Sequence, residues 1–136
     1  MKTSEKLTVG NLYSRNDLAD QFNITDATIK TGIFQPSGTS SVWLFITEQK
    51  SADRTQYEDR LDGDRLHWEG QSAGRKDKVI IEHAIHGREL LVFYRSSKNE
   101  YPEYAFKYEG PFRYVSHDPG NSEIRKPSKF ILDRDA

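Results

Sequence analysis

The sequence of 136 residues contains no cysteine and only one methionine. Without thiols the chain can form neither a disulfide nor a thiolate metal site. An apolar run such as residues 42–46 is far shorter than the roughly 20 residues that cross a bilayer. The first six residues also lack the apolar stretch of a signal peptide. We therefore expect a cytoplasmic protein that makes no contact with a membrane.

An excess of one charge is missing as well, because 20 basic residues are balanced by 21 acidic ones. The net charge of −1 does not by itself indicate a nucleic-acid partner. A protein that binds phosphates needs a local basic surface rather than a basic total. Basic residues do gather at residues 75–78 and 125–129. Such clusters are also typical of an ordinary solvated surface, so charge alone decides nothing.

Aromatic residues are present in number, with seven Phe, seven Tyr and two Trp. They supply large apolar area, which a disordered chain of this charge would lack. The chain length fits one domain with one core, and no repeat or interdomain linker is visible. We therefore expect a single domain over residues 1–136.

Two short helices are predicted. Ser14 is a favourable N-cap, and Asp17 three positions later makes a near-capping box, so a helix should run over residues 15–22. The pattern of residues 77–86 predicts the second helix, with Gly87 suited to the position after its end.

The rest of the chain reads as strands. Residues 41–47 and 89–95 are apolar on both faces and should lie at the centre of the sheet. The sequence Asp-Gly-Asp at residues 62–64 predicts a hairpin turn. Further strands are expected at residues 30–34, 57–61, 65–71, 104–108, 112–117 and 128–132, with turns at 35–38, 109–111 and 118–121. This pattern predicts an α+β domain with a mostly antiparallel curled sheet or open barrel and two or three short helices.

No complete catalytic constellation is found. A Gly-x-Ser-x-Gly elbow, a phosphate-binding Gly-rich loop and the HExxH spacing are all missing. His83 and His86 lie three apart on the predicted helix, but a metal would need a third ligand. Glu123 begins only a faint nuclease-like pattern. We therefore expect no catalytic residue, no metal and no cofactor, and a binding domain rather than an enzyme.

Two loops carry groups suited to binding. Residues 48–57 follow the first central strand and are rich in side chains that contact phosphates or base edges. Residues 99–105 contain Tyr101 and Pro102. Proline fixes its own φ and restrains the preceding residue, so this pair predicts a rigid apolar ledge. A tyrosine that simply packs the start of an edge strand would give the same local pattern.

Four stretches together resemble a known family: residues 31–36, residues 43–48 continued by 53–57, residues 66–72 and residues 104–117. They are similar to the sulfur-binding domains of McrA-like, HNH-type modification-dependent restriction endonucleases, over roughly residues 11–133. The resemblance implies a module that binds double-stranded DNA carrying a phosphorothioate, within a type IV restriction system of bacterial defence. It further implies a nuclease domain in cis or in trans, so that the chain is expected to be cut from a longer restriction protein.

The resemblance also implies a site. In these domains a Tyr-Pro-x-x-Ala stretch forms a small apolar cup around the sulfur, helped by an arginine on another loop. Here the matching residues are Tyr101, Pro102 and Ala105, with Arg54 as the arginine. Asp53 stands where the family has a histidine, which is a departure at the contact itself. The expected DNA contacts are Lys50, Asp53, Thr55, Gln56, Gln71, Ser72, Arg75, Lys78, Arg125 and Lys126.

The chemistry of such a cup can be argued without the family. A phosphate oxygen placed against apolar side chains loses its water and gains no hydrogen bond, which costs on the order of 1–3 kcal/mol. Sulfur is larger, more polarizable and a poorer acceptor, so it loses less hydration and gains dispersion contact. The cup therefore selects against ordinary DNA, and a fixed cup should also distinguish the two configurations at phosphorus.

Three other functions remain open at the level of sequence. A reader of modified cytosine would need an aromatic pocket for a flipped base, for which Trp43, Trp68 and Tyr57 are candidates. A small metal-dependent nuclease would use His83, His86 or Glu123. A protein-interaction module would show no salt-dependent affinity for DNA.

Overall fold

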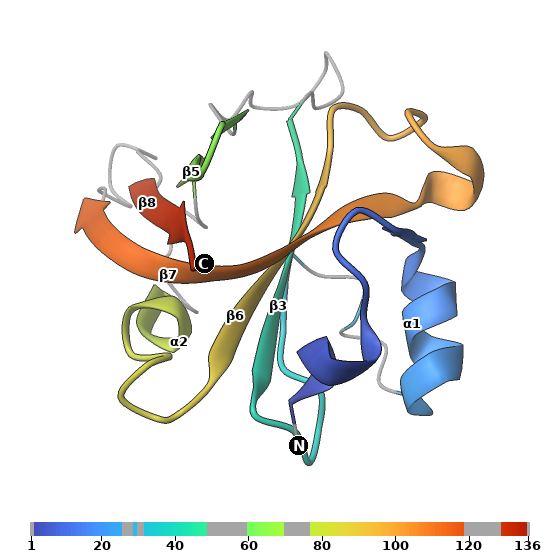
Figure 1. The fold of residues 1–136 in the computed structure, drawn as a ribbon, viewed down its shortest axis with the longest axis horizontal. Helices are drawn as coiled ribbons and strands as arrows, with labels where there is room; N and C mark the ends of the chain where they lie inside the picture. The colour runs from blue at the N-terminus through green and yellow to red at the C-terminus, as the bar shows by residue number, and fades with distance from the viewer. Residues whose placement is uncertain are drawn as a thin grey trace, which may run out of the picture.

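The computed structural model describes residues 2–25, 29, 32–48, 60–69, 77–118 and 129–135. Figure 1 shows one long strand, β7, crossing the molecule, with α1 towards its right-hand end and α2 towards its left-hand end. The helical elements are η1 (Thr3–Lys6), α1 (Arg15–Phe22), α2 (Asp77–Ile81) and η3 (Pro102–Tyr104). The strands are β1 (Leu12–Tyr13), β2 (Ile33–Phe34), β3 (Ser41–Thr47), β4 (Arg60–Asp62), β5 (Arg65–Glu69), β6 (Glu89–Arg95), β7 (Phe106–Asp118) and β8 (Lys129–Arg134). No described helix is long and apolar enough to span a bilayer.

The predicted first helix is confirmed residue for residue as α1. The Oγ atom of Ser14 accepts a hydrogen bond from the backbone N–H of Asp17, and the Asp17 carboxylate accepts one from the backbone N–H of Ser14. This reciprocal pair satisfies two amide donors that the first helical turn leaves without a partner. Asn23 ends the helix in the left-handed conformation, with φ of 54°.

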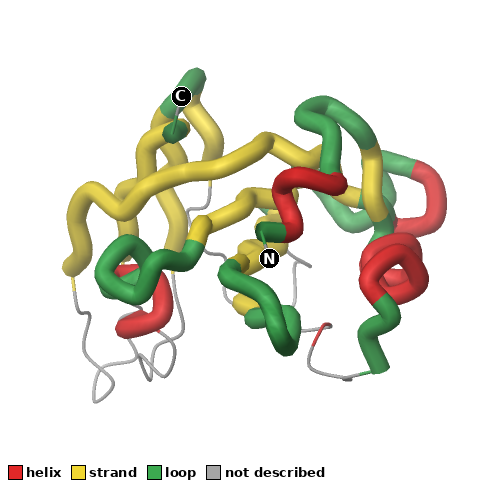
Figure 2. The backbone as a smooth tube through the Cα atoms, turned by 60° about the horizontal axis from the view of Figure 1, so that its bottom comes forward, coloured by secondary structure: helices red, strands yellow, loops and turns green. Residues whose placement is uncertain are grey.

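The strands form one sheet in the order β2-β3-β6-β7-β8-β5-β4, and β1 pairs with β7. The central pair β3 and β6 is parallel, in register from Ser41 opposite Glu89 to Thr47 opposite Arg95. Every other described pair is antiparallel. Figure 2 shows the curvature of the strands, and among the described residues β2 and β4 stand at the two ends of the strand order without pairing with each other. The α+β class with a mostly antiparallel, open and curled sheet is therefore confirmed.

The two central strands are buried on both faces, as their unbroken apolar runs predict. On β3 the odd and even residues enter different clusters, so that Trp43 packs on the side of α1 and Leu44 on the side of α2. The cluster on the α1 side consists of Leu18, Ile29, Phe34, Trp43, Phe45, Leu91, Phe93, Phe106 and Tyr108. The cluster on the α2 side is built on Val42, Leu44, Ile46, Ile80, Leu90, Val92, Phe112 and their neighbours.

The hairpin at residues 62–64 is also confirmed. Asp62 pairs with Arg65 across a two-residue turn in which Gly63 has φ of 62°. The alternation on β5 then buries Leu66 and Trp68 in the core. Within the described residues β4 spans Arg60–Asp62 and β5 spans Arg65–Glu69, and the predicted strand residues 57–59 and 70–71 lie outside the described residues.

The predicted turn at residues 109–111 is wrong. The chain continues through it as part of the 13-residue strand β7. The register with β6 shifts between Val92 and Phe93, so that Glu109 is an extra residue between Tyr108 and Gly110. Gly110 has φ of 95°, a value that a residue with a Cβ rarely adopts. The glycine therefore makes a β-bulge that bends the strand rather than reversing it.

The second predicted helix is shorter than residues 77–86. It ends at Ile81, and residues 82–87 form consecutive turns. The backbone N–H of His83 donates to the carbonyl of Ile80, a tighter spacing than an α-helix has. Gly87 was predicted to follow the helix end directly, but it lies at the end of these turns, after the helix has ended at Ile81, with φ of 67°.

Candidate functional site

The two loops singled out in the sequence leave the sheet at the same end. Thr47 and Arg95 are the last residues of the parallel strands β3 and β6, and they are neighbours in register. The backbone N–H of Glu48 donates to the carbonyl of Arg95 at 3.0 Å. Because both strands run in the same direction, the chain segment after β3 and the segment after β6 start side by side. Parallel pairing, which the hairpin pattern did not predict, thus places the residues at which the two loops begin side by side.

The second loop ends in a tight left-handed turn. After the extended Tyr101, η3 carries Glu103 with φ of 57° and Tyr104 with φ of 60°. Two consecutive residues with side chains in this region cost about 1–2 kcal/mol each relative to ordinary backbone. Residues 104 and 105 were predicted to belong to a strand, which is wrong, since β7 begins only at Phe106. A strained turn of this kind persists only where its surroundings fix it.

The buried side chain of Arg95 holds this turn in place. Its Nη1 donates to the carbonyl oxygen of Tyr104 at 2.7 Å, and its Nε donates to the Oγ1 of Thr47 at 2.8 Å. The guanidinium carbon lies 3.9 Å from the centre of the Phe106 ring. The side chain is 7% exposed, and burial lowers the pKa of its guanidinium below the ordinary value. Arg95 was not predicted as a site residue, because its only signal in the sequence is a charge at the end of an apolar strand.

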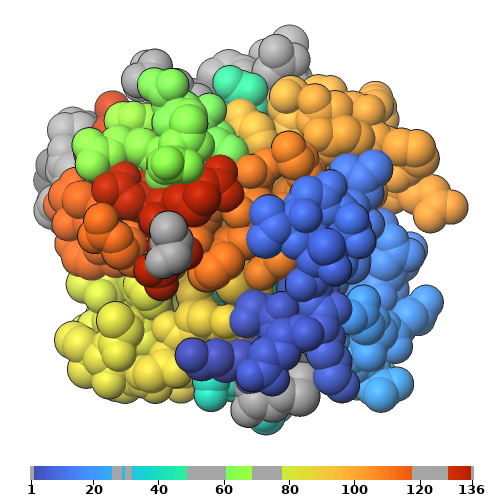
Figure 3. All heavy atoms as spheres, viewed as in Figure 1, coloured from blue at the N-terminus to red at the C-terminus, as the bar shows by residue number. Residues whose placement is uncertain are grey.

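The three residues of the predicted apolar ledge differ in exposure. Pro102 is exposed, Tyr101 is half-buried and Ala105 is only 6% exposed. Burial raises the pKa of the Tyr101 phenol, and the charges of Glu100 and Glu109 raise it further. Of these three residues, Pro102 and part of Tyr101 are therefore exposed, whereas Ala105 is buried and its backbone N–H donates to the carbonyl of Pro102 at 3.1 Å. In Figure 3 the segment near residue 100 forms the upper right edge of the molecule, above the N-terminal residues.

Most of the predicted DNA contacts cannot be placed against this ledge. Arg54 and the residues Lys50, Asp53, Thr55, Gln56, Gln71, Ser72, Arg75, Arg125 and Lys126 lie outside the described residues. Lys78 is exposed on α2. Figures 1 and 2 both place α2 on the opposite side of the molecule from η3. The described residues therefore give no support for Lys78 acting together with the ledge.

The buried histidine is committed to the backbone. The Nδ1 atom of His83 lies 2.9 Å from the carbonyl oxygen of Arg88, and the backbone N–H of Tyr114 donates to Nε2 at 3.3 Å. Both contacts are satisfied when the proton sits on Nδ1. Both ring nitrogens are then used, whereas a metal would need a free lone pair. His86 is exposed and lies 3.7 Å from the carboxylate of Glu82. Within the described residues no group of three potential ligands surrounds a common point.

Two of the three candidates for lining a pocket around a flipped base are tryptophans that belong to the core. Trp43 is fully buried, and its Nε1 donates to the Oγ1 of Thr3 at 2.9 Å. Trp68 is 7% exposed and packs against Phe130. Tyr57, the third candidate, lies outside the described residues.

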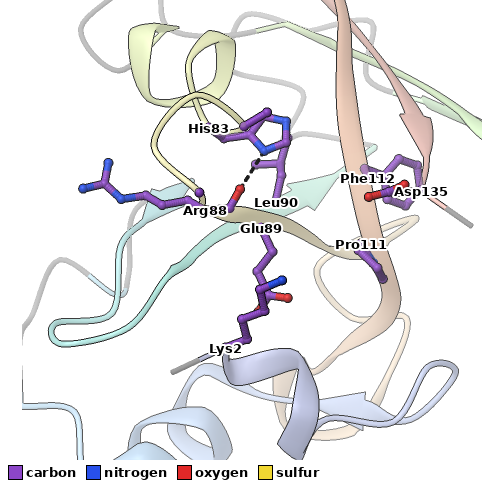
Figure 4. Close-up of a pocket in the computed structure, with 10 residues that line it drawn as sticks. Lys2, His83, Arg88, Glu89, Leu90, Pro111, Phe112 and Asp135 are labelled. Atoms are coloured by element: carbon purple, nitrogen blue, oxygen red, sulfur yellow. Dashed lines mark hydrogen bonds between the residues drawn. The ribbon is translucent and has the colours of Figure 1, made fainter.

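A pocket of about 230 Å³ opens at the other end of β6. Figure 4 shows Glu89 and Lys2 on one side of it, with Phe112 and Asp135 across from them. The Glu89 carboxylate accepts hydrogen bonds from the hydroxyl groups of Ser4 and Ser41, so it holds η1 to the start of β3 and β6. This use of the carboxylate is structural. The pocket is separated from the ledge by the length of β6.

These observations define an α+β domain in which two parallel strands at the centre of a mixed sheet release two loops at one end. A family model described as "Domain of unknown function (DUF3427)" matches residues 7–131, and the chain belongs to that family. The fold is similar to that of a solved structure, "Modification dependent TagI restriction endonuclease", with a TM-score of 0.52 and 19% sequence identity. The match covers 94% of this chain and 50% of that one, so this chain spans about half of that enzyme's length. Among curated proteins, none matches the sequence.

Proposed function

We propose that this chain is a DNA-binding module that recognises phosphorothioate-modified double-stranded DNA. The sulfur would lie against the apolar face of Tyr101 and Pro102, backed by Ala105, with Arg54 reaching it from the neighbouring loop. The observation that carries the proposal is the left-handed turn at Glu103 and Tyr104, which Arg95 holds in place. The likeness to an enzyme named as modification-dependent supports the reading of a DNA mark.

A rigid ledge suits discrimination between sulfur and oxygen. The two differ by one atom, so a surface that adjusts to either would not separate them. Here the backbone strain is offset by hydrogen bonds and ring contact from Arg95, which keeps the ledge in one shape. The apolar side chains then exclude water from the non-bridging atom that contacts them, whether it is oxygen or sulfur. Only oxygen loses strong hydrogen bonds to water in this way, because sulfur is a poor acceptor.

The charges beside the ledge lower the affinity for any phosphate group, whether it carries sulfur or oxygen. Glu100 and Glu103 are exposed on the turn, and Lys98 lies 5.2 Å from the centre of the Tyr104 ring. The turn itself therefore offers an ordinary phosphate little net attraction. Affinity for ordinary DNA must come from basic residues elsewhere, and it should be weak and sensitive to salt.

We propose further that the module binds without cutting, and that a nuclease domain in cis or in trans supplies cleavage. His83 gives no support for metal-assisted hydrolysis, since both of its ring nitrogens are engaged by the backbone. A reader of modified cytosine remains the second candidate, because the name of the structural relative does not specify the mark. The burial of Trp43 and Trp68 does not favour it.

The test compares binding to one duplex with and without a single phosphorothioate, at fixed moderate salt and in several sequence contexts. We expect the phosphorothioate to bind roughly 10- to 100-fold more tightly, which corresponds to about 1.4–2.7 kcal/mol. Pro102→Glu should abolish this preference. Val115→Glu is the matched control, because Val115 is an exposed apolar residue of β7 outside the turn. Equal binding of both duplexes would refute the assignment, and a preference for a methylated duplex would establish the second candidate.

A further inference from the structure

Tyr104 carries an exposed aromatic side chain on a strained backbone. Its φ of 60° lies in the left-handed region, which glycine adopts freely and a residue with a Cβ adopts only at a cost in folding free energy. The residue is 58% exposed, so burial of the ring in the fold offsets little of that cost. Strained residues of this kind cluster at ligand-binding sites.

The main chain of Tyr104 is anchored although its side chain is exposed. The Nη1 atom of the buried Arg95 donates to the carbonyl oxygen of Tyr104 at 2.7 Å. Glu103 before it also has positive φ, and Ala105 after it is buried. Figure 1 shows the segment between β6 and β7 projecting from the right-hand edge of the molecule. The turn therefore presents the Tyr104 ring to solvent from a fixed backbone.

A lysine lies beside this ring. The Nζ atom of Lys98 is 5.2 Å from the centre of the Tyr104 ring, a distance typical of a cation–π contact. Lys98 is exposed, and it is the only basic residue of the loop at residues 96–105, which also carries the exposed acids Glu100 and Glu103. The loop thus places an aromatic ring and an ammonium group next to each other, beside the ledge.

We propose that Tyr104 and Lys98 bind the nucleotide next to the phosphorothioate, with the ring packed on the deoxyribose and the ammonium group paired with the adjoining phosphate. The inference rests on the proposed function for the position of the sulfur, and it adds two DNA contacts to that site. Along a DNA strand an apolar sugar face alternates with a charged phosphate, and a ring beside an ammonium group is complementary to that alternation. Contacts of this kind position a duplex on the protein.

The two contacts should act equally on ordinary and phosphorothioate DNA, because neither involves the atom that is replaced by sulfur. They determine how tightly either duplex is held, whereas Tyr101 and Pro102 determine the preference between the two. Lys98 should contribute to the salt dependence of binding, because an ammonium group that pairs with a phosphate releases condensed counterions. The Tyr104 ring should not contribute to it, since its contact with the sugar is apolar.

Glycine is the decisive substitution at residue 104, because it removes the ring and relieves the positive φ at once. Tyr104→Gly should therefore leave the urea midpoint no lower than that of the wild type, which a ring needed for folding would not allow. Glu103→Gly is the matched control, since it relieves the neighbouring positive φ and keeps the ring. Tyr104→Phe removes only the hydroxyl group. Tyr104→Asn replaces Tyr104→Gly if the glycine variant does not fold, because asparagine also tolerates this region.

Dissociation constants are measured over a range of salt for an ordinary duplex and for the same duplex with one phosphorothioate. We expect Tyr104→Gly to lose roughly tenfold in affinity for both duplexes, from the ring area that the sugar covers, at unchanged salt dependence. Lys98→Met should lower the slope of the logarithm of affinity against the logarithm of salt concentration by about 1. Glu103→Gly should not weaken binding, and Tyr104→Phe should retain most of the affinity.

An unchanged affinity in Tyr104→Gly would overturn the inference. An equal loss in Glu103→Gly would also overturn it, because rigidity of the turn and not the ring would then be responsible. A loss in Tyr104→Phe as large as in Tyr104→Gly would assign the contact to the hydroxyl group and refute packing on the sugar. An unchanged salt slope in Lys98→Met would refute the phosphate contact. The proposed function fails separately, if the wild type binds both duplexes equally while Tyr104→Gly still weakens both.

Discussion

Replacing Gly110 by alanine tests the β-bulge at residues 109–111, where a turn was predicted and the chain instead continues as strand β7. Gly110 has φ of 95°, and a Cβ added to it would lie 3.1 Å from the Cγ2 of Val9. Gly38 is a matched comparison, because its φ is 75° but a Cβ added there would meet no atom within 4 Å. Gly38→Ala therefore reports backbone strain alone, whereas Gly110→Ala reports strain and a close contact.

The expected losses in the free energy of unfolding follow from the backbone strain and from the contact with Val9. Positive φ costs an alanine about 1–2 kcal/mol, and up to about 1 kcal/mol is regained because alanine restricts the unfolded chain. We therefore expect a loss of about 1 kcal/mol for Gly38→Ala. The contact with Val9 should add up to about 1 kcal/mol in Gly110→Ala, because the Val9 side chain, which is 59% exposed, must shift by a few tenths of an ångström. The total for Gly110→Ala is then up to about 2 kcal/mol.

Urea unfolding, followed by the fluorescence of the tryptophans, measures both losses as shifts of the midpoint at constant slope. Adding Val9→Ala to Gly110→Ala should recover the part due to the contact and leave the part due to strain. A loss for Gly110→Ala that does not exceed that for Gly38→Ala would show that the contact is relieved at no cost. A loss below about 0.5 kcal/mol would refute the strained bulge altogether.

Three further outcomes are expected. Ser14→Ala should lower the free energy of unfolding by about 1 kcal/mol through loss of the helix cap, while Ser14→Gly should cost only a few tenths, as urea unfolding would show. The hydrogen bond and charge of Arg65 lower the pKa of the Asp133 carboxyl in the folded state. The ionised carboxylate therefore stabilises the fold above the ordinary carboxyl pKa, and this stabilisation is lost as the pH falls through the lowered value. Asp133→Asn should therefore flatten the decline of the unfolding midpoint with acid, and an unchanged decline would contradict this. Because both nitrogens of His83 are engaged, neither EDTA nor added zinc should change the thermal midpoint, and a rise with zinc would reveal a metal site.

The elements predicted correctly are those whose signals are local. The cap at Ser14 and the stripe that follows it determine α1, and the unbroken apolar runs determine β3 and β6. Parallel pairing of those two strands was not predicted, because hairpin signals elsewhere favoured antiparallel neighbours. The Gly-Pro pair at residues 110–111 misled for a similar reason. It is typical of turns, but a bulge accommodates the same backbone within a strand.

In the candidate site, too, the residues with a local signal were predicted and those that only the fold brings together were not. Tyr101 and Pro102 stand out in the sequence because proline restricts its neighbourhood. The left-handed turn after them could not be predicted, since neither Glu103 nor Tyr104 is a residue that favours positive φ. Arg95 was not predicted either, because only the fold brings its guanidinium to the carbonyl of Tyr104.

The most direct test of the account uses one duplex in three forms: ordinary, and with a single phosphorothioate of each configuration at phosphorus. A fixed ledge contacts only one of the two non-bridging positions. We therefore predict that one stereoisomer binds at least roughly tenfold more tightly than both the other stereoisomer and the ordinary duplex. Tyr101→Ser should remove that difference. Equal binding of all three duplexes would contradict the assignment of this domain as a reader of phosphorothioate DNA.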